Sequence, residues 1–579
     1  MPRPEPLSLS EFVDAARGSV PADLVFRNAR VVNVLTGEVH EETVGVKGDR
    51  ILGFGPYRAA SPDGEVDLRG AYLCPALWDA HLHIESTMTT PRTFGALAAA
   101  RGTAAVVTDP HEIANVRGLA GLEAFLADAA VAPVEVHVML PSCVPATHLE
   151  TAGASLSAAD LAGFYGREGV LGLAEMMNVP GFLFGDPGVR AKVDDARRRG
   201  LPIDGHSPLL TGLDLNAYVG AGIRTDHECL GREEAREKAR RGMSIWIREG
   251  TAAKNLDDLL PLVTPENSER FAFATDDRHP WDLLTHGHVD HHVRRAIGLG
   301  LDPVLAVRLA SLTCARHYGF RDRGAIAPGH RADLLTTATL TDFRPDLVVL
   351  GGRLVAQGGS LLVEVSAGRM EEGPAFRVEG FDRTRLQVGA RDGASVRVIE
   401  VTPGSLATGA STEPALVTSG YAVADPSRDL AKLAVVERHK GTGNVAVSFA
   451  RGLGIARGAI ASSVAHDSHN VVVVGADDAS METAVRRAAA IGGGIVVADG
   501  AQVLAEVPLP VAGLMSNAPI ADVDAAERKA NEACRALGTR TDHPFMTLAF
   551  LALPVIPELK LTDRGLVDVK KFDFVPAVV

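Results

Sequence analysis

Eight short apolar runs that end in polar residues recur through the first half of the chain. Their spacing of about 28 residues is close to the length of one βαβ unit. Helix-like stretches, such as 118–130 and 231–241, lie between several of them. Strands that alternate with helices form parallel sheets, and eight of them predict an α/β fold of the (β/α)8 TIM-like barrel type. The runs span 78–83, 104–110, 134–140, 171–176, 202–207, 222–228, 243–249 and 271–277. A doubly wound sheet is the alternative, but the Gly-rich phosphate loop that such a sheet commonly carries after an early strand is not seen.

Two similar blocks of short strands flank this region, at 22–73 and 332–364. Their pattern leaves open whether they are halves of one sheet domain or two separate units. From about residue 385 the chain becomes rich in Gly and Val, with a predicted helix at 481–492 between two strands, which indicates a further α/β or α+β domain. A linker is expected near 365–384. The predicted bounds are 1–75 and 332–380 for the two sheet blocks, 76–331 for the barrel and 381–579 for a C-terminal domain.

Charge and composition exclude several classes of protein. The 579-residue chain has a formal net charge of −14, which argues against a broad phosphate-binding face and a nucleic-acid partner. The chain has no long apolar stretch that is free of charge, so we predict no membrane span. Five scattered cysteines without a CxxC pair argue against a disulfide framework, and the N-terminal segment MPRPEPLSLSEF has no apolar core typical of a secretory signal. We therefore expect a cytoplasmic protein.

Polar residues gather where the predicted strands end, which is the edge of a (β/α)8 barrel that carries catalytic groups. Histidines together with carboxylates are typical of a metal site. The candidates are His81, His83, Asp109, His111, Glu112, Glu175, His206, His227, Glu228, Asp276 and Asp277.

The histidines favour metal ligation when they are taken together. His81 and His83 are two positions apart on a strand and so point the same way. Alone they could be ordinary polar residues at a strand end, but His206 and His227 on later strands favour ligands. Glu175 ends the fourth run, and its two oxygens could bridge two ions; a helix cap or a salt bridge is the alternative.

Asp276 ends the eighth run, in ATDDRHP. A carboxylate beside a metal-bound water can take its proton and return it later. The other interpretation, a helix N-cap, suits its neighbour Asp277 at least as well.

Other polar clusters leave two interpretations open. The segment 109–112 could line the pocket or form a turn and helix start, and Arg278 with His279 could shape the site or brace loops. The four histidines within 286–292 could bind a metal, support the site, or form a polar helix face. His466 and His469, with Asp467 and Ser468 between them, could close over the pocket, bind another ion, or belong to a simple loop.

Longer segments carry a resemblance to a known family. The pattern of HxH, a carboxylate on strand four, histidines on strands five and six and an aspartate on strand eight resembles the amidohydrolase superfamily. DAHLHIESTMTTP, TDPHEIANV, GLAEMMNVPG, IDGHSP and ATDDRHP resemble the adenine deaminase family in particular, and SVAHDSHNVVVVG, GGGIVV and LPLPVAGLMS resemble its C-terminal domain. The likeness extends over nearly the whole chain.

The resemblance implies a barrel, a composite β-sandwich built from both flanks, and an appended C-terminal domain. It implies hydrolytic deamination of adenine to hypoxanthine and ammonia, in purine salvage or catabolism. It also implies two divalent metal ions, Mn²⁺ foremost with Fe²⁺ or Zn²⁺ as alternatives, and a homodimer or higher homo-oligomer. Transferred by motif, one ion would be held by His81, His83 and Asp276, the other by His206 and His227, with Glu175 bridging.

In this scheme Asp276 moves the proton of the attacking water. Glu228 is the first candidate for protonating ring N1 of adenine, because it adjoins His227, and Glu85 is the alternative. Two other functions stay open: a different amidohydrolase reaction on the same metal frame, and a non-catalytic metal protein that senses a purine. The presence of Asp276 argues against the second.

Overall fold

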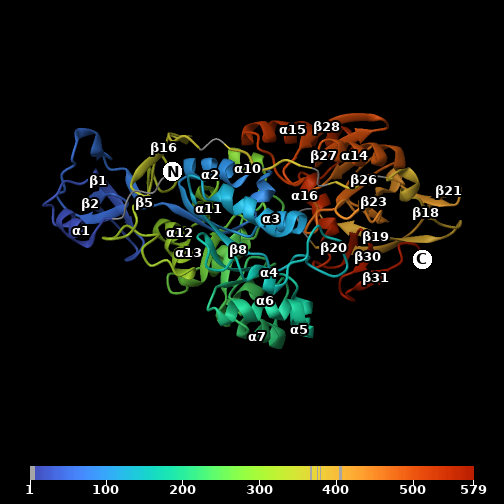
Figure 1. The fold of residues 1–579 in the computed structure, drawn as a ribbon, viewed down its shortest axis with the longest axis horizontal. Coiled ribbons are helices and arrows are strands. Elements are labelled where there is room, and N and C mark those ends of the chain that lie inside the picture. The colour runs from blue at the N-terminus through green and yellow to red at the C-terminus, as the bar shows by residue number, and fades with distance from the viewer. Residues whose placement is uncertain (1–6, 366–367, 374–375, 379, 403–406) are drawn as a thin grey trace.

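The structure is a computed structural model that describes residues 7–365, 368–373, 376–378, 380–402 and 407–579. The first six residues lie outside the described residues, as do parts of the expected linker at 365–384. Three bodies follow one another along the long axis in Figure 1: an N-terminal sheet, a central barrel and a C-terminal α/β unit.

Each of the eight apolar runs contains a parallel strand, as predicted. The strands form two sheets, in the orders β10-β9-β8-β7-β6 and β11-β12-β13. Backbone hydrogen bonds link the sheets at both junctions: Arg224 N donates to the Ile203 carbonyl (3.1 Å), and Asp276 N donates to the His81 carbonyl (3.0 Å). A TIM-like arrangement results. The strands are β6 (Leu77–Leu82), β7 (Thr103–Thr108), β8 (Glu135–Leu140), β9 (Val170–Met176), β10 (Ile203–Gly205), β11 (Thr225–Asp226), β12 (Ser244–Arg248) and β13 (Phe271–Ala274).

Helices alternate with these strands, and both helices predicted between them are present. The stretch 231–241 contains α8, and 118–130 is part of α3, which begins earlier, directly after Pro110, and kinks at Gly118, where φ is +59°. The helices of this region are α2 (Pro91–Ala100), α3 (His111–Ala129), α4 (Ala158–Leu161), α5 (Val179–Phe184), α6 (Pro187–Arg198), α7 (Gly212–Gly220), α8 (Arg232–Arg240), α9 (Leu256–Leu259), α10 (Pro280–Thr285), α11 (Val289–Gly298), α12 (Pro303–Leu309) and α13 (Leu312–His317).

The two flanking blocks meet in one nine-stranded sheet. Strand β14 pairs antiparallel with β5, from Leu334 opposite Pro75 to Thr337 opposite Tyr72, so the barrel is inserted between the two halves of this sheet. Helix α1 (Leu9–Ala16) lies against it (Figure 1). The strands are β1 (Leu24–Asn33), β2 (Glu38–Lys47), β3 (Arg50–Phe54), β4 (Glu65–Asp67), β5 (Tyr72–Pro75), β14 (Leu334–Thr337), β15 (Leu347–Leu350), β16 (Arg353–Gln357) and β17 (Ser360–Leu361).

The C-terminal unit is built on an eight-stranded sheet covered on both faces, which explains its Val-rich runs. In β26 (Val471–Gly475), Val471 and Val473 pack with α14 (Asp478–Ala490) on one face. Val472 and Val474 pack on the other face with α15 (Ile520–Ala536) and α16 (Pro544–Ala549). A strand buried on both faces is continuously apolar instead of alternating.

The order of that sheet is β20-β19-β24-β23-β26-β25-β27-β28, and two three-stranded sheets lie beside it. The remaining strands of the unit are β18 (Val388–Gly389), β19 (Ser395–Val401), β20 (Thr408–Pro414), β21 (Leu416–Thr418), β22 (Tyr421–Val423), β23 (Leu430–Val436), β24 (Val445–Arg451), β25 (Ala459–Ser462), β27 (Gly494–Asp499), β28 (Gln502–Pro508), β29 (Leu559–Thr562), β30 (Gly565–Asp568) and β31 (Asp573–Val575).

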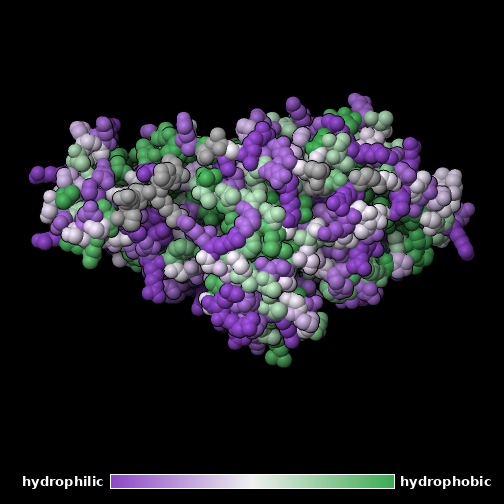
Figure 2. Space-filling view, viewed as in Figure 1, coloured by the Kyte–Doolittle hydropathy of each residue, from purple (hydrophilic) through white to green (hydrophobic). Residues whose placement is uncertain are grey.

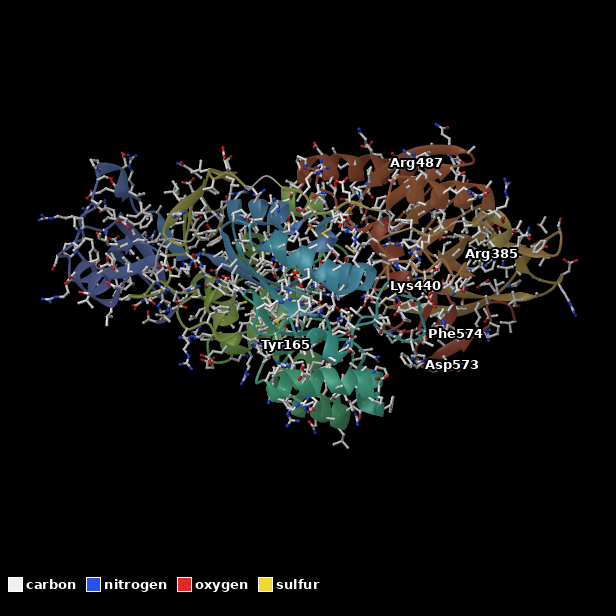
Figure 3. The ribbon with its side chains drawn as sticks, viewed as in Figure 1. Tyr165, Arg385, Lys440, Arg487, Asp573 and Phe574 are labelled. Atoms are coloured by element: carbon white, nitrogen blue, oxygen red, sulfur yellow. The ribbon has the colours of Figure 1, made fainter. Side chains whose placement is uncertain are left out.

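Polar contacts hold the C-terminal unit against the barrel. Ser516 N donates to the Met88 carbonyl (2.9 Å), and Asn470 Nδ2 donates to the Thr151 carbonyl (2.8 Å). Lys440, which Figure 3 places at the boundary between the two units, donates through Nζ to the Gly153 carbonyl. These contacts bring the loop between β25 and β26 to the barrel.

The surface and the cysteines agree with the composition. Figure 2 shows hydrophilic side chains over much of the face in view, with apolar residues scattered among them. Within the described ranges, no helix combines the length and apolar character needed to cross a membrane. All five cysteines are free and buried, which fits the prediction that they form no disulfide framework.

Replacement of a barrel core side chain tests this packing. Phe273 in β13 is fully buried, so Phe273→Ala should lower stability by about 3–5 kcal/mol through lost burial and cavity formation. Calorimetric melting of the full chain would measure this loss. Phe184 is 89% exposed, and the matched variant Phe184→Ala should melt like the parent. Equal shifts for the two variants would contradict the assignment of Phe273 to the core.

Candidate metal centre

The six predicted ligands come together at the C-terminal ends of the barrel strands. Each lies in the last residues of its strand or just after it, where the chain turns toward a helix. None is more than 7% exposed, so these charged and polar groups are buried. They are His81, His83, Glu175, His206, His227 and Asp276.

Glu175 lies between two pairs of imidazoles. Its Oε1 is 3.2 Å from His83 Nε2 and 3.9 Å from His81 Nε2. Its Oε2 is 3.0 Å from His206 Nδ1 and 3.2 Å from His227 Nε2. One oxygen therefore faces each pair, which is the arrangement a bridging carboxylate requires.

Asp276 lies on the side of the first pair. Its Oδ1 is 3.4 Å from His83 Nε2 and 3.8 Å from His81 Nε2. The backbone leaves the extended conformation here, with φ of +56°, a region that aspartate tolerates better than most residues. His81, His83 and Asp276 form one group of candidate ligands, and His81, Glu175 and His227 form another.

The polar atoms of the centre fit divalent cations. Burial alone would raise the pKa of Glu175, but His227 and His206 hold it well below its usual range, so the carboxylate is charged. Within the described part of the chain, His81 Nε2, Glu175 Oε2 and His206 Nε2 are buried without hydrogen-bond partners. Unpaired buried polar atoms are costly, and imidazole with carboxylate suits transition-metal ions. The residues present therefore fit a two-ion centre.

Neighbouring groups orient the candidate ligands. His83 Nδ1 lies 3.0 Å from the Asp109 carbonyl, which turns Nε2 toward Glu175. Asp79, in β6, accepts from Thr275 N (3.0 Å) and lies 2.9 Å from His288 Nε2. Such contacts fix ligand orientation in metal sites.

Two histidines of the segment 286–292 contact barrel strands beside the candidate ligands. His288 contacts Asp79, as above, and His292 Nε2 lies 2.9 Å from the Ala274 carbonyl at the end of β13. His291 Nε2 lies 3.9 Å from Glu249, and His286 Nε2 lies 4.0 Å from Asp282. The contacts of His288 and His292 match the supporting role that was one of the predicted interpretations.

Arg248, at the end of β12, is a functional residue that the sequence reasoning missed. It is buried and donates to Asp276 Oδ2 and, through Nη2, to Glu228 Oε1 at 2.7 Å. Although burial opposes it, Arg248 is the chief cause that holds the pKa of Asp276 well below its usual range. Arg248 lies within the predicted run 243–249, but a pattern of histidines and carboxylates at strand ends does not select an arginine.

The two candidate acids have different surroundings. Glu228 is paired with Arg248, and its pKa is raised by burial although Arg248 opposes this. Glu85 lies in the short 3-10 helix η2 (Ile84–Thr87) and accepts from Ile113 N at 3.3 Å. Burial raises the pKa of Glu85 to about 7.

The segment 109–112 combines both of its predicted interpretations. His111 begins α3 after a turn at Pro110, yet its side chain faces the centre. Its Nδ1 is 3.0 Å from Asp109 Oδ2 and 3.7 Å from Glu175 Oε1. Glu112 Oε1 is 3.1 Å from Ser86 Oγ. The helix start and the pocket lining are therefore the same residues.

The C-terminal unit reaches the edge of the centre. His466 Nδ1 lies 3.6 Å from Glu112 Oε1, so the loop 465–470 closes over the barrel, one of the interpretations left open. His279 Nδ1 lies 2.6 Å from Glu527 Oε1 of α15, and so braces the two units. A cavity of about 10 Å³ lies between them, lined in part by Glu85, Ser86, Met88, Val464, His466 and Phe545.

Comparison with known proteins gives full-length matches. The amidohydrolase family model matches residues 72–355, and the model of the adenine deaminase C-terminal domain matches 405–573. An adenine deaminase of Desulfatibacillum aliphaticivorans is 48% identical over 98% of this chain and 99% of its own length. That of Kosmotoga olearia is 43% identical over 98% of this chain and 99% of its own. A solved enamidase structure covers 60% of this chain and 98% of its own, at 16% identity and a TM-score of 0.44.

Metal content tests the position of Glu175. Because each of its oxygens faces a histidine pair, Glu175→Gln should hold about one or two fewer Mn²⁺ ions per chain than the parent, since a two-metal site would lose the group between its ions. Elemental analysis after dialysis would measure this. Glu123→Gln, on the exposed face of α3, is the matched control and should bind as the parent does. Full metal content in Glu175→Gln would rule out the bridging role.

Proposed function

The chain belongs to the adenine deaminase family of amidohydrolases and is a metal-dependent hydrolase, and we propose that it converts adenine and water to hypoxanthine and ammonia. The observation that carries this is Glu175, which presents one oxygen to each of two histidine pairs inside a chain that matches this family from end to end. Adenine is a small molecule, and the cleaved bond joins C6 to its exocyclic amine.

We propose two divalent ions at the centre, Mn²⁺ first, with Fe²⁺ or Zn²⁺ as alternatives that the same ligands accept. When bound, such ions lower the pKa of water so that hydroxide is available near neutral pH. Glu175 would contact both ions. The other proposed ligands are His81, His83 and Asp276 for one ion and His206 and His227 for the other.

Asp276 is proposed to move the proton of the attacking water. Its Oδ2 accepts from Arg248, while Oδ1 faces the His81 and His83 side, where the water would be activated. The low pKa that Arg248 enforces keeps Asp276 in its ionised form, the form that can accept a proton. Asp276 then returns that proton to the departing amine, since general base and general acid are one residue acting in sequence.

Protonation of ring N1 is assigned to one of two residues, Glu228 or Glu85. Burial raises the pKa of Glu228, and its pairing with Arg248 opposes that rise. Glu85 Oε2 is buried with no hydrogen-bond partner among the described residues, and a pKa of about 7 leaves a large protonated fraction near neutral pH. These surroundings favour Glu85 as the proton donor, with Glu228 positioned to orient Arg248.

The finer architecture and the setting are also part of the proposal. We infer a barrel domain at 76–331, a composite β-sandwich from 1–75 and 332–380, and a C-terminal domain at 381–579.

The five buried free cysteines support a reducing, cytoplasmic setting. The formal charge of −14 argues against nucleic acid as a partner, and no membrane association is proposed. Purine salvage as the role, and a homodimer or higher homo-oligomer as the assembly, follow from the family.

Ammonia release from adenine by Mn²⁺-loaded protein tests the reaction. Asp276→Asn should lower turnover by about 10²–10⁴-fold, the usual contribution of general acid–base catalysis. Asp257→Asn is the matched control, because Asp257 is exposed and pairs with Arg295 at the surface. No ammonia from a protein that holds both ions would discard adenine and direct the search to other cyclic amidines and amides. Failure to bind ions would favour the non-catalytic alternative.

The proton donor is tested by paired variants at neutral pH. Glu85→Gln removes the proposed donor but keeps its size, so turnover should fall by about 10²-fold or more with metal content unchanged. Glu228→Gln should have a smaller effect, because Arg248 keeps its contact with Asp276. The reverse order of effects would assign the proton transfer to Glu228.

A further inference from the structure

A second group of histidines and carboxylates lies where the C-terminal unit meets the barrel. His111 and Glu112 come from the start of α3, and His466 and Asp467 from the loop between β25 and β26. All four are buried, with at most 3% of their surface exposed. His111, Glu112 and His466 place ligand atoms within 4.8 Å of one another.

The atoms of this interdomain cluster approach one another without forming hydrogen bonds. His466 Nδ1 is 3.6 Å from Glu112 Oε1 and 3.8 Å from Asp467 Oδ1, and His111 Nε2 is 3.6 Å from Asp467 Oδ1. These separations are longer than hydrogen bonds. They are close to the roughly 3–3.5 Å between neighbouring ligands that each bond one ion at about 2.0–2.2 Å.

Each of the four residues also has a buried atom for which the residues that the structure describes offer no hydrogen-bond partner. These atoms are His111 Nε2, Glu112 Oε2, His466 Nε2 and Asp467 Oδ2. Such atoms are rare in folded proteins, and several in one place indicate an ion, a water or a ligand. The cavity beside His466 measures about 10 Å³, which is room for about one water.

The imidazoles are oriented as ligands. His111 Nδ1 contacts Asp109 Oδ2 at 3.0 Å, which leaves Nε2 for the cluster, in the carboxylate–histidine arrangement common beside metals. The His466 ring stacks on Phe550 at a centroid distance of 4.4 Å, which fixes its plane.

His469 belongs to the neighbourhood but not to the ligands. Its Nδ1 accepts from Ala465 N at 3.2 Å, so in the neutral ring Nε2 carries the proton and has no lone pair to offer. That Nε2 lies 4.0 Å from Glu112 Oε2 and so presents a proton to the carboxylate.

We propose that His111, Glu112, His466 and Asp467 form a third divalent-cation site, distinct from the two-ion centre, that joins the C-terminal unit to the barrel. Two imidazoles and two carboxylates suit Mn²⁺, Fe²⁺ or Zn²⁺. The atoms that face one another across the site are His111 Nε2, Glu112 Oε1, His466 Nδ1 and Asp467 Oδ1. A cation bound among them offsets the two buried carboxylates and gives His111 Nε2 a partner. The C-terminal unit thereby fixes His111, whose Nδ1 lies 3.7 Å from Glu175.

Anomalous diffraction from the full-length protein loaded with Mn²⁺ locates the ions directly. A third peak surrounded by the four residues is the expected result. Peaks at the Glu175 centre alone would overturn the proposal, as would an adenine-bound structure in which the purine contacts these four residues and no third peak is present. This measurement uses the parent protein, so it does not depend on whether any variant folds.

Metal counting supplies an independent test. His466→Gln and Asp467→Asn should each lose about one of three Mn²⁺ ions per chain, while the ions at Glu175 stay bound. His148→Gln, at an exposed histidine, is the matched control and should keep all three. An unchanged count in folded His466→Gln would contradict the third site. If His466→Gln also loses the ions at Glu175, while the parent is active on adenine, the two sites are not independent. The absence of a third peak in the parent would then overturn the proposal.

Discussion

The buried carboxylate of Glu175 among the imidazoles of the strand ends is the interaction on which the rest of the structure depends. An ionised carboxylate inside a protein is costly unless it is paired, and here each oxygen has at least two imidazole nitrogens within 3.9 Å. No single element could supply those partners. Four strands, β6, β9, β10 and β11, must end at the same depth for the arrangement to exist, and a parallel barrel is a fold in which strand ends share one edge.

Hydrogen bonds from neighbouring side chains position the proposed ligands. Asp79 in β6 accepts from the backbone of His81 and of Thr275 and contacts His288, so a side chain that is not itself a proposed ligand helps to position His81. Arg248 does the same for the opposite side, because it holds Asp276 and Glu228 together. Loss of either contact would leave a buried charge unpaired, which is more costly than loss of a surface contact.

Much of this organisation could be predicted from the sequence for a simple physical reason. Barrel strands are covered on both faces, so they appear as short apolar runs, and the first polar residue after each run marks the catalytic edge. That rule found all eight strands and brought Glu175 and the histidines together. The rule does not select Arg248, because a positively charged side chain is not a metal ligand. Arg248 nevertheless lies in one of the eight runs, at the last residue of β12.

Contacts between units were beyond such reasoning. His466 and Glu112 are separated by a whole sheet domain in the chain, and each has an ordinary local explanation as a loop residue or a helix start. Only the packing of α15 and the loop 465–470 on the barrel brings them together. Local sequence patterns report local structure, so a site shared by two domains has no signature of its own.

The C-terminal unit changes the physics of the centre as well as its shape. Its residues Val464, His466 and Phe545 line a cavity together with Glu85 and Ser86, and burial raises the pKa of Glu85 to about 7. Electrostatic interactions strengthen as water is excluded, so the buried contact of Arg248 with Asp276 is stronger than the same contact would be at the surface. In the proposed reaction Glu85 would hold a proton on one side of the centre while Asp276 holds a charge on the other, and a hydrolytic deamination needs both at once.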